Sequence, residues 1–125
     1  MKPNIIIVDD DREMCEELRE TLEDEGYSVR TAFNGLDGLA VVEKHGCDLL
    51  LLDLKMPGLT GEEILKRLSQ GQVKPKALVL TARLLNGESA RERLAEQPGW
   101  ELVHDVISKP FDIDALLRMI KTLIG

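Results

Sequence analysis

Leu49–Pro57, LLLLDLKMP, is the stretch that decides how this sequence folds: four consecutive leucines run into Asp53, and Pro57 closes the segment. A short apolar run without polar alternation is typical of a strand buried on both faces, although a buried helix can show the same run. The short length and the proline favour a strand. Asp53 would then stand where this strand leaves the core, and in open α/β sheets ligands bind at that edge.

A single aspartate at a strand end is often only a turn former. A second stretch changes this interpretation. Ile5–Asp11, IIIVDDD, is another short apolar run that breaks into carboxylates. Two such strands in one sequence favour a functional acidic edge over isolated turn chemistry.

The composition predicts a single soluble domain over residues 1–125, because this length allows a substantial core. Of the residues, 43% are hydrophobic and 31% are charged, and no apolar run approaches the roughly 20 residues of a membrane span. The N-terminus turns acidic after four apolar residues, which does not fit a signal peptide. We therefore predict a cytoplasmic protein without a membrane partner, and the sequence leaves its oligomeric state open.

The formal net charge of −7 argues against direct binding of this domain to DNA or to an anionic membrane. It suits a metal ion or a basic protein face. The two cysteines, Cys15 and Cys47, lack C-x-x-C spacing, which argues against a zinc site or a disulfide scaffold.

Strand and helix patterns alternate along the chain, which predicts a parallel sheet. Further strands are expected at Tyr27–Phe33, Ala77–Thr81 and within Glu101–Ser108, and helices at Asp11–Glu25, Leu36–His45, from near Thr60 to Gly71, at Asn86–Gln97, and after Asp112. The expected buried positions include Leu36, Leu39 and Ala40 in the second helix and Ala90, Leu94 and Ala95 in the fourth.

Five strand–helix units fit an α/β fold of the doubly wound, flavodoxin-like kind, with a five-stranded parallel sheet in the order 2-1-3-4-5. In this topology the carboxyl ends of the strands share one edge of the sheet. The polar residues that follow or end the strands then converge there: Asp9, Asp10, Asp53, Thr81 and Lys109.

Three carboxylates at one edge repel one another and raise each other's proton affinity, so they persist only with a cation between them. An oxygen-rich site with few protein ligands suits Mg²⁺, which often shares its coordination with phosphate oxygens. Lys109 adds a movable ammonium and Thr81 a hydroxyl donor. Together these groups indicate a phosphoryl site built around a nucleophilic carboxylate.

Four separated motifs, in this order, carry a resemblance to a known family. They are Asp9-Asp10 after IIIV, Asp53 in D-x-x-M-P-G, Thr81-Ala82, and Lys109-Pro110-Phe111. Over nearly its whole length the sequence resembles the receiver domain of two-component response regulators. The resemblance implies a signalling module rather than an enzyme, with at most self-phosphorylation and autodephosphorylation chemistry.

By this resemblance, Asp53 accepts a phosphoryl group from a sensor histidine kinase or a phosphotransfer protein. Asp10 and Asp53 are expected to bind Mg²⁺ together with the backbone carbonyl of Lys55, and Asp9 is expected to assist through water.

The resemblance also implies roles for the last two strand ends. Thr81 would bond a phosphoryl oxygen, and Lys109 would pair with the phosphate. The Lys109–Pro110 peptide bond is expected to be cis, which proline permits at modest energetic cost.

The sequence departs from the family in two places. Receivers usually carry Phe or Tyr three residues before the pocket lysine, and here the residue is Val106. The segment between Thr81 and Lys109 is also longer than usual. We therefore expect an output signal to travel through residues 83–100 rather than through an aromatic side chain.

Two other functions fit parts of the pattern. A haloacid-dehalogenase-like phosphatase also uses an aspartate at a strand end, but it needs a second aspartate two residues later, where this chain has Lys55. A degenerate receiver would dock partners without being phosphorylated. It ranks below a phosphorylated receiver, because all the pocket residues needed for phosphorylation are present.

Overall fold

The computed structural model describes residues 2–82 and 90–125. Its parallel sheet has the order β2-β1-β3-β4-β5, which confirms the predicted topology. The strands are β1 (Asn4–Val8), β2 (Ser28–Ala32), β3 (Leu49–Asp53), β4 (Lys76–Ala82) and β5 (Val103–Lys109). The helices are α1 (Arg12–Asp24), α2 (Gly35–His45), α3 (Gly61–Gln70), α4 (Ala90–Leu94) and α5 (Ile113–Ile124), with a short 3-10 helix, η1 (Trp100–Leu102).

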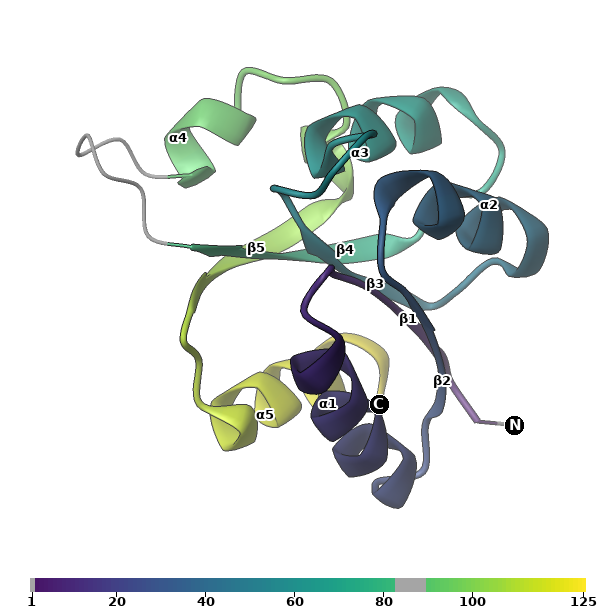
Figure 1. Ribbon diagram of the computed structural model, residues 1–125, viewed down its shortest axis with the longest axis vertical. Helices are drawn as coiled ribbons and strands as arrows, with labels where there is room; N and C mark the ends of the chain where they lie inside the picture. Colours follow the sequence, from purple (N-terminus) through teal and green to yellow (C-terminus); the bar gives the residue numbers. More distant parts are fainter. Residues whose placement is uncertain (1, 83–89) are drawn as a thin grey trace.

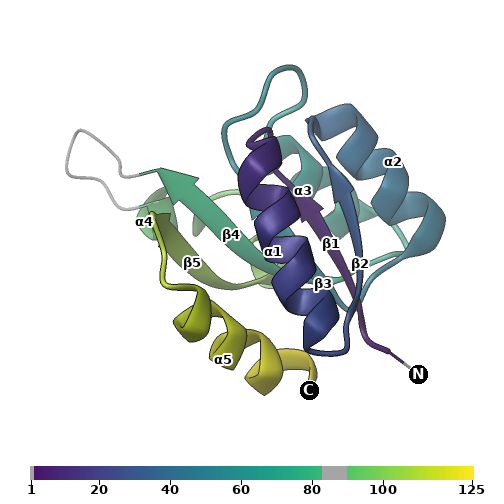
Figure 2. The ribbon, with the colours of Figure 1, turned by 60° about the horizontal axis from the view of Figure 1, so that its bottom comes forward.

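Helices cover both faces of the sheet. Helices α2, α3 and α4 lie on one face, and α1 and α5 lie side by side on the other (Figures 1 and 2). Successive residues of β1 alternate between the two sides: Ile6 and Val8 join the core under α2 and α3, whereas Ile5 and Ile7 join the core under α1 and α5. Burial on both faces explains why the strands are nearly continuous apolar runs.

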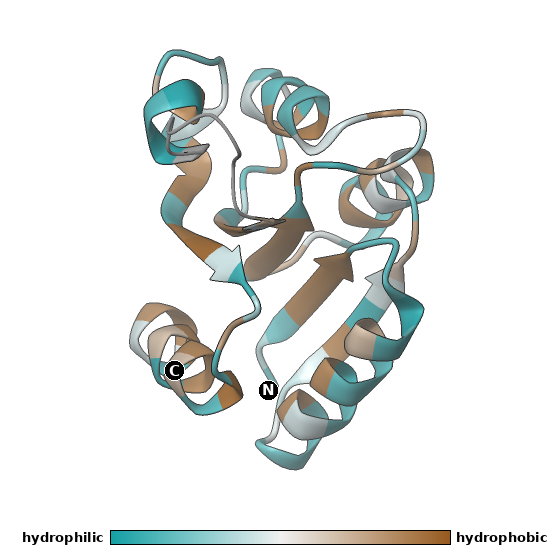
Figure 3. Ribbon diagram, turned by 60° about the vertical axis from the view of Figure 1, so that its left-hand side comes forward, coloured by the Kyte–Doolittle hydropathy of each residue, from teal (hydrophilic) through white to brown (hydrophobic). Residues whose placement is uncertain are grey.

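Strand β3 is the centre of this arrangement. All five of its residues are buried, and it pairs with β1 on one side and β4 on the other. In Figure 3 the inner strands are mostly hydrophobic, while the helices carry hydrophilic stretches. Asp53 is the last residue of β3, so the central strand itself delivers a carboxylate to the sheet edge.

Side chains cap α1, α3 and α5 at their N-termini. Thr60 and Glu63 form a reciprocal capping box at the start of α3, and Asp112 accepts a hydrogen bond from the Asp114 N–H at the start of α5. Asp11 caps α1 by accepting from the Met14 N–H at 3.1 Å. This cap fixes where the acidic loop after β1 ends.

Two of the three residues of α2 that were predicted to be buried are exposed. Leu39 is buried as expected, but Leu36 is 64% exposed and Ala40 is also exposed. The reason is a glycine face: a Cβ at Gly38 would lie 2.5 Å from a methyl carbon of Val8, so only glycine allows the helix to approach the sheet this closely. The inward face consists of Gly35, Gly38, Leu39 and Val42.

The region before β5 differs more from the prediction. Of the expected helix Asn86–Gln97, α4 covers Ala90–Leu94; residues 83–89 and the side chain of Ala90 lie outside the described part. Leu94 is buried as predicted, whereas Ala95 is exposed. The prediction for Ala95 was wrong because the helix ends at Leu94, so Ala95 no longer lies on a helical face.

Strand β5 was predicted within Glu101–Ser108 and runs from Val103 to Lys109, since Glu101 belongs to η1. Within residues 2–82 and 90–125, no helix has both the length and the apolar character needed to cross a membrane.

Candidate functional site

An acidic cluster lies at the carboxyl edge of the sheet. Asp9 and Asp10 follow β1, and Asp53 ends the neighbouring strand β3. One carboxylate oxygen from each of the three residues lies within 4.8 Å of the others. Asp9 and Asp53 are buried, whereas Asp10 is exposed. The cluster is therefore closed on the side of Asp9 and Asp53 and open to solvent on the side of Asp10.

Lys109, the last residue of β5, reaches this cluster from the far strand of the sheet. Its ammonium Nζ donates to Asp9 Oδ2 at 2.6 Å and lies 3.7 Å from Asp53 Oδ2. The following Lys109–Pro110 peptide bond is cis, as predicted. One lysine thus contacts two buried carboxylates and offsets only part of their negative charge.

Backbone donors orient the same acids. The Lys55 N–H donates to Asp53 Oδ1 at 3.3 Å, and the Asp11 N–H donates to Asp9 Oδ1 at 3.0 Å. On the other side of the loop, the buried thiol of Cys15 donates to the Asp9 carbonyl at 3.4 Å. The acidic side chains are therefore held before any cation or substrate arrives.

The pKa of Asp53 is raised above its ordinary value. Burial is the largest cause and the nearby Asp9 carboxylate is the second, while Lys109 and the Lys55 N–H act in the opposite direction. The sequence prediction gave repulsion among carboxylates as the reason, so it had the direction right but not the leading cause.

The pKa of Lys109 is also raised. Burial alone would lower this pKa and is the largest single influence, but the hydrogen bond and charge of Asp9, with Asp53, outweigh it. Lys109 is therefore a cation throughout the neutral pH range.

Thr81 lies beside the cluster without a hydrogen bond to it. It is buried near the end of β4, and its hydroxyl donates to the Ala82 carbonyl at 3.2 Å. Of the six residues that the sequence singled out, the structure brings together Asp9, Asp10, Asp53 and Lys109, and adds the Lys55 N–H. The phosphoryl role of Thr81 stays a prediction.

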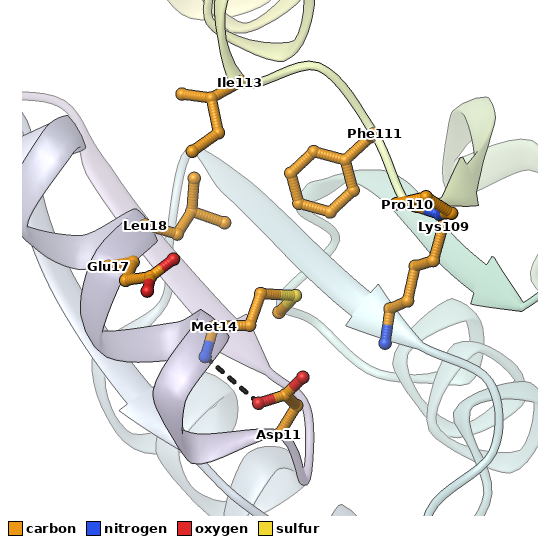
Figure 4. Close-up of a pocket in the computed structure, with 8 residues that line it drawn as sticks. All are labelled: Asp11, Met14, Glu17, Leu18, Lys109, Pro110, Phe111 and Ile113. Atoms are coloured by element: carbon orange, nitrogen blue, oxygen red, sulfur yellow. Dashed lines mark hydrogen bonds between the residues drawn. The ribbon is translucent and has the colours of Figure 1, made fainter.

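A groove opens next to Lys109, between α1 and the start of α5 (Figure 4). Its volume is about 360 Å³. Met14, Leu18 and Phe111 give it an apolar lining, and the carboxylates of Asp11 and Glu17 add negative charge. Met14 is half-buried in this groove.

Comparison with known proteins adds an independent line of support. The family model of the response regulator receiver domain matches residues 5–121. The chain is 36% identical over 121 residues to an uncharacterized transcriptional regulatory protein, YkoG, of Bacillus subtilis, covering 96% of this chain and 50% of that protein. It is 40% identical over 121 residues to the response regulator MprA of Mycobacterium leprae, with the same coverage of 96% and 50%. The chain thus spans about half the length of these curated relatives.

Solved structures give the same match. The chemotaxis protein CheY4 of Vibrio cholerae has 29% identity and a TM-score of 0.81, over 99% of this chain and 100% of that one. The response regulator TrrA of Thermotoga maritima, crystallised in complex with Mg²⁺–BeF, has 30% identity and a TM-score of 0.79, again over 99% and 100%.

Proposed function

Because this chain belongs to the response regulator receiver domain family, we propose that it is a phosphorylation-dependent signalling module whose phosphoacceptor is Asp53. The observation that carries this proposal is the placement of the Asp53 carboxylate. It ends the central strand, lies 3.7 Å from the Lys109 ammonium, and shares a cluster with Asp9 and Asp10. We assign residues 1–125 to one receiver domain.

The residues of the cluster fit Mg²⁺. They offer three carboxylate oxygens within 4.8 Å of one another, and oxygen is the ligand that this cation prefers. Two of the acids are buried with one lysine between them, so the site carries excess negative charge. We propose that Asp10, Asp53 and the Lys55 carbonyl hold the ion and that Asp9 acts through water. When bound, Mg²⁺ would neutralise charge on the phosphoryl oxygens.

The chain's own groups supply the remaining chemistry. An Asp53 carboxylate oxygen forms a bond to phosphorus while the bond between phosphorus and the donor's histidine nitrogen breaks, and the imidazole leaves with its electron pair. The burial that raises the pKa of Asp53 also makes its carboxylate more basic than an exposed one. We propose that Lys109 then pairs with the phosphoryl oxygens and that Thr81 turns its hydroxyl toward them.

The groove beside Lys109 supports a protein donor, either a sensor histidine kinase or a phosphotransfer protein. Its apolar lining suits a partner side chain such as leucine, and Asp11 and Glu17 favour a basic partner surface. The net charge of −7 argues against DNA as a direct partner. We propose that any DNA-binding output resides in an attached or separate partner.

Intact-mass measurement tests the proposal. Incubation with a small-molecule phosphodonor and Mg²⁺ should add one phosphoryl group to the wild type, and none when a chelator replaces Mg²⁺. Asp53→Asn should stay unmodified, whereas Asp24→Asn, at the distant end of α1, should react normally. An unmodified wild type, under conditions that phosphorylate a control receiver, would instead favour docking without phosphorylation.

A further inference from the structure

Arg12 makes a contact that the proposed chemistry does not use. It is the first residue of α1, directly after the acidic stretch Asp9–Asp11. Its guanidinium carbon lies 4.4 Å from the centroid of the Phe33 ring. This distance is typical of a cation resting on an aromatic face.

The sheet fixes the position of the ring. Phe33 follows β2 directly, and it is half-buried against the core under α1 and α5. At the same point, the Asp9 N–H donates to the Ala32 carbonyl at 3.1 Å. The ring therefore sits on a rigid strand end, beside the loop that carries Asp10.

Without the ring, Arg12 would have a different partner within reach. Asp10 is exposed and lies only two residues away along the chain. Guanidinium groups bind carboxylates strongly and often through two hydrogen bonds. The helix dipole gives Arg12 a further reason to seek negative charge, because a cation at the N-terminus of a helix is unfavourable.

In residues 2–82 and 90–125, however, no ion pair joins Arg12 to a carboxylate. Lys109 behaves differently, since its ammonium is bonded to Asp9 at 2.6 Å. Lys109 thus pairs with the buried acid Asp9, whereas Arg12 rests on the ring of Phe33.

We propose that Phe33 holds the Arg12 guanidinium away from Asp10 and so keeps the open side of the acidic cluster available to Mg²⁺. Phe33 and Arg12 are positioning residues in this account. A released Arg12 would act as an internal cation that competes with the metal ion for Asp10. The inference rests on the proposed function in taking Mg²⁺ as the ion that this site binds.

Calorimetric titration of Mg²⁺ into the whole chain tests this with three variants. Phe33→Leu keeps apolar volume but removes the ring, and should raise the Mg²⁺ Kd about twofold to fivefold, the factor that corresponds to an exposed cation–π contact. Arg12→Gln should leave the Kd equal to or below that of the wild type. The double variant should match Arg12→Gln, since no cation remains to compete. Added salt should shrink the ratio between Phe33→Leu and wild type, because screening weakens competition between charges.

Arg12→Lys provides a second test in which the Phe33 ring itself is unchanged. It keeps the charge but loses the planar group that stacks on the ring, so it should weaken Mg²⁺ binding in the same direction as Phe33→Leu. Thermal unfolding of every variant in chelator checks that each one is folded. Should Phe33→Leu fail to fold, Arg12→Lys and Arg12→Gln still decide the matter.

Three results would overturn the inference alone. The Kd could be the same in wild type, Phe33→Leu and Arg12→Lys. The double variant could bind as weakly as Phe33→Leu, which would assign the effect to packing of the ring. Arg12→Gln could also bind Mg²⁺ as weakly as Phe33→Leu, which would mean that the contact only fixes the start of α1 against the end of β2. A wild type that fails to bind Mg²⁺ would overturn the proposed metal site as well, so the two failures are distinguishable.

Discussion

Lys109 is the cation that the chain itself supplies to its buried acids. Asp9 is fully buried, and Lys109 is its charged hydrogen-bond partner at 2.6 Å. Removing one member of such a pair leaves the other desolvated and uncompensated, which costs more than the pair gains by forming. The same residue thus serves stability in the resting state and, in the proposed function, the phosphoryl group after transfer.

We expect Lys109→Gln to lower the free energy of unfolding by about 1.5–3 kcal/mol, the range for hydrogen bonds to charged groups. Mg²⁺ should recover part of this loss, because it supplies the missing positive charge at the same acids. Urea unfolding with and without Mg²⁺ measures both effects. Lys66→Gln, at an exposed position of α3, is the matched control. Equal losses in the two variants would show that Lys109 does not stabilise the acids.

Asp53 makes the stability of the metal-free protein depend on pH. The pKa of Asp53 in the folded state is raised, with burial first and Asp9 second among the causes. Between the ordinary value of 3.8 and this raised value, the folded state binds the proton more tightly than the unfolded state does. The contribution of Asp53 to stability therefore falls as the pH rises through this window.

Asp53→Asn cannot ionise, so in chelator it should become progressively more stable than wild type as the pH rises from the ordinary pKa of 3.8 through the raised pKa of Asp53. Thermal unfolding at a series of pH values measures the difference. A difference that stays constant with pH, or one that favours the wild type near neutrality, would contradict the assigned direction of the Asp53 pKa.

The candidate site residues that lie at strand ends could be predicted from the sequence. Asp9, Asp10, Asp53 and Lys109 follow or end strands, and topology alone brings them to one edge. The contact between Arg12 and Phe33 was not predictable, because neither residue stands out by type or spacing. It depends on the direction of two side chains, one at the start of α1 and one directly after β2.

At the scale of elements, the start of α3 fixes the end of β3. The Gly61 N–H donates to the Leu54 carbonyl at 3.1 Å. A Cβ at Gly61 would lie 2.5 Å from the Asp53 carbonyl oxygen and 2.9 Å from the Leu54 Cα. Both contacts are with backbone atoms that cannot rotate away, so only glycine lets the helix pack directly behind the end of β3.

Gly61→Ala should therefore destabilise the fold by about 1–3 kcal/mol, the usual cost of overpacking, and should weaken Mg²⁺ binding because Asp53 is displaced. Gly71→Ala, at the other end of α3, is the control: its nearest atoms would be 3.6 and 3.7 Å away, and its φ of −96° suits alanine. Denaturant unfolding and calorimetry should separate the two variants. Equal stability of the two variants would contradict the claim that the close approach at Gly61 requires glycine.

Glycine also explains why the bounds of α2 were easier to predict than the residues that it buries. The extent of α2 followed from its periodicity, but the apolar pattern put Leu36 and Ala40 inside, where the structure has a face containing Gly35 and Gly38. A hydrophobic pattern assumes that side chains fill the interface, and at a close helix approach the backbone fills it instead.

Two arginines of helix α4 form ion pairs with neighbouring elements. Arg93 pairs with Glu62 in the first turn of α3 at 3.4 Å, and Arg91 pairs with Asp105 of β5. The first contact joins α4 to α3 and the second joins it to β5, both through side chains that no hydrophobic pattern identifies. The expectation that an output signal passes through residues 83–100 stays a prediction.

For the whole molecule, the order of the strands is what converts scattered polar residues into one site. Strands β1 and β3 are neighbours at the centre of the sheet, and Lys109 reaches them from β5, across the end of β4. This much followed from the alternation of strand and helix patterns. The two separate cores on either side of the sheet hold this edge in place without contributing to its chemistry.

The most direct measurement of the central claim is the position of the phosphoryl group in the intact chain. After reaction with a small-molecule phosphodonor and Mg²⁺, reduction of the acyl phosphate with borohydride followed by peptide mass spectrometry identifies the modified residue. We predict modification at Asp53 alone, and none when a chelator replaces Mg²⁺. Modification at Asp9, Asp10 or a histidine in place of Asp53, or labelling that persists without Mg²⁺, would contradict this prediction.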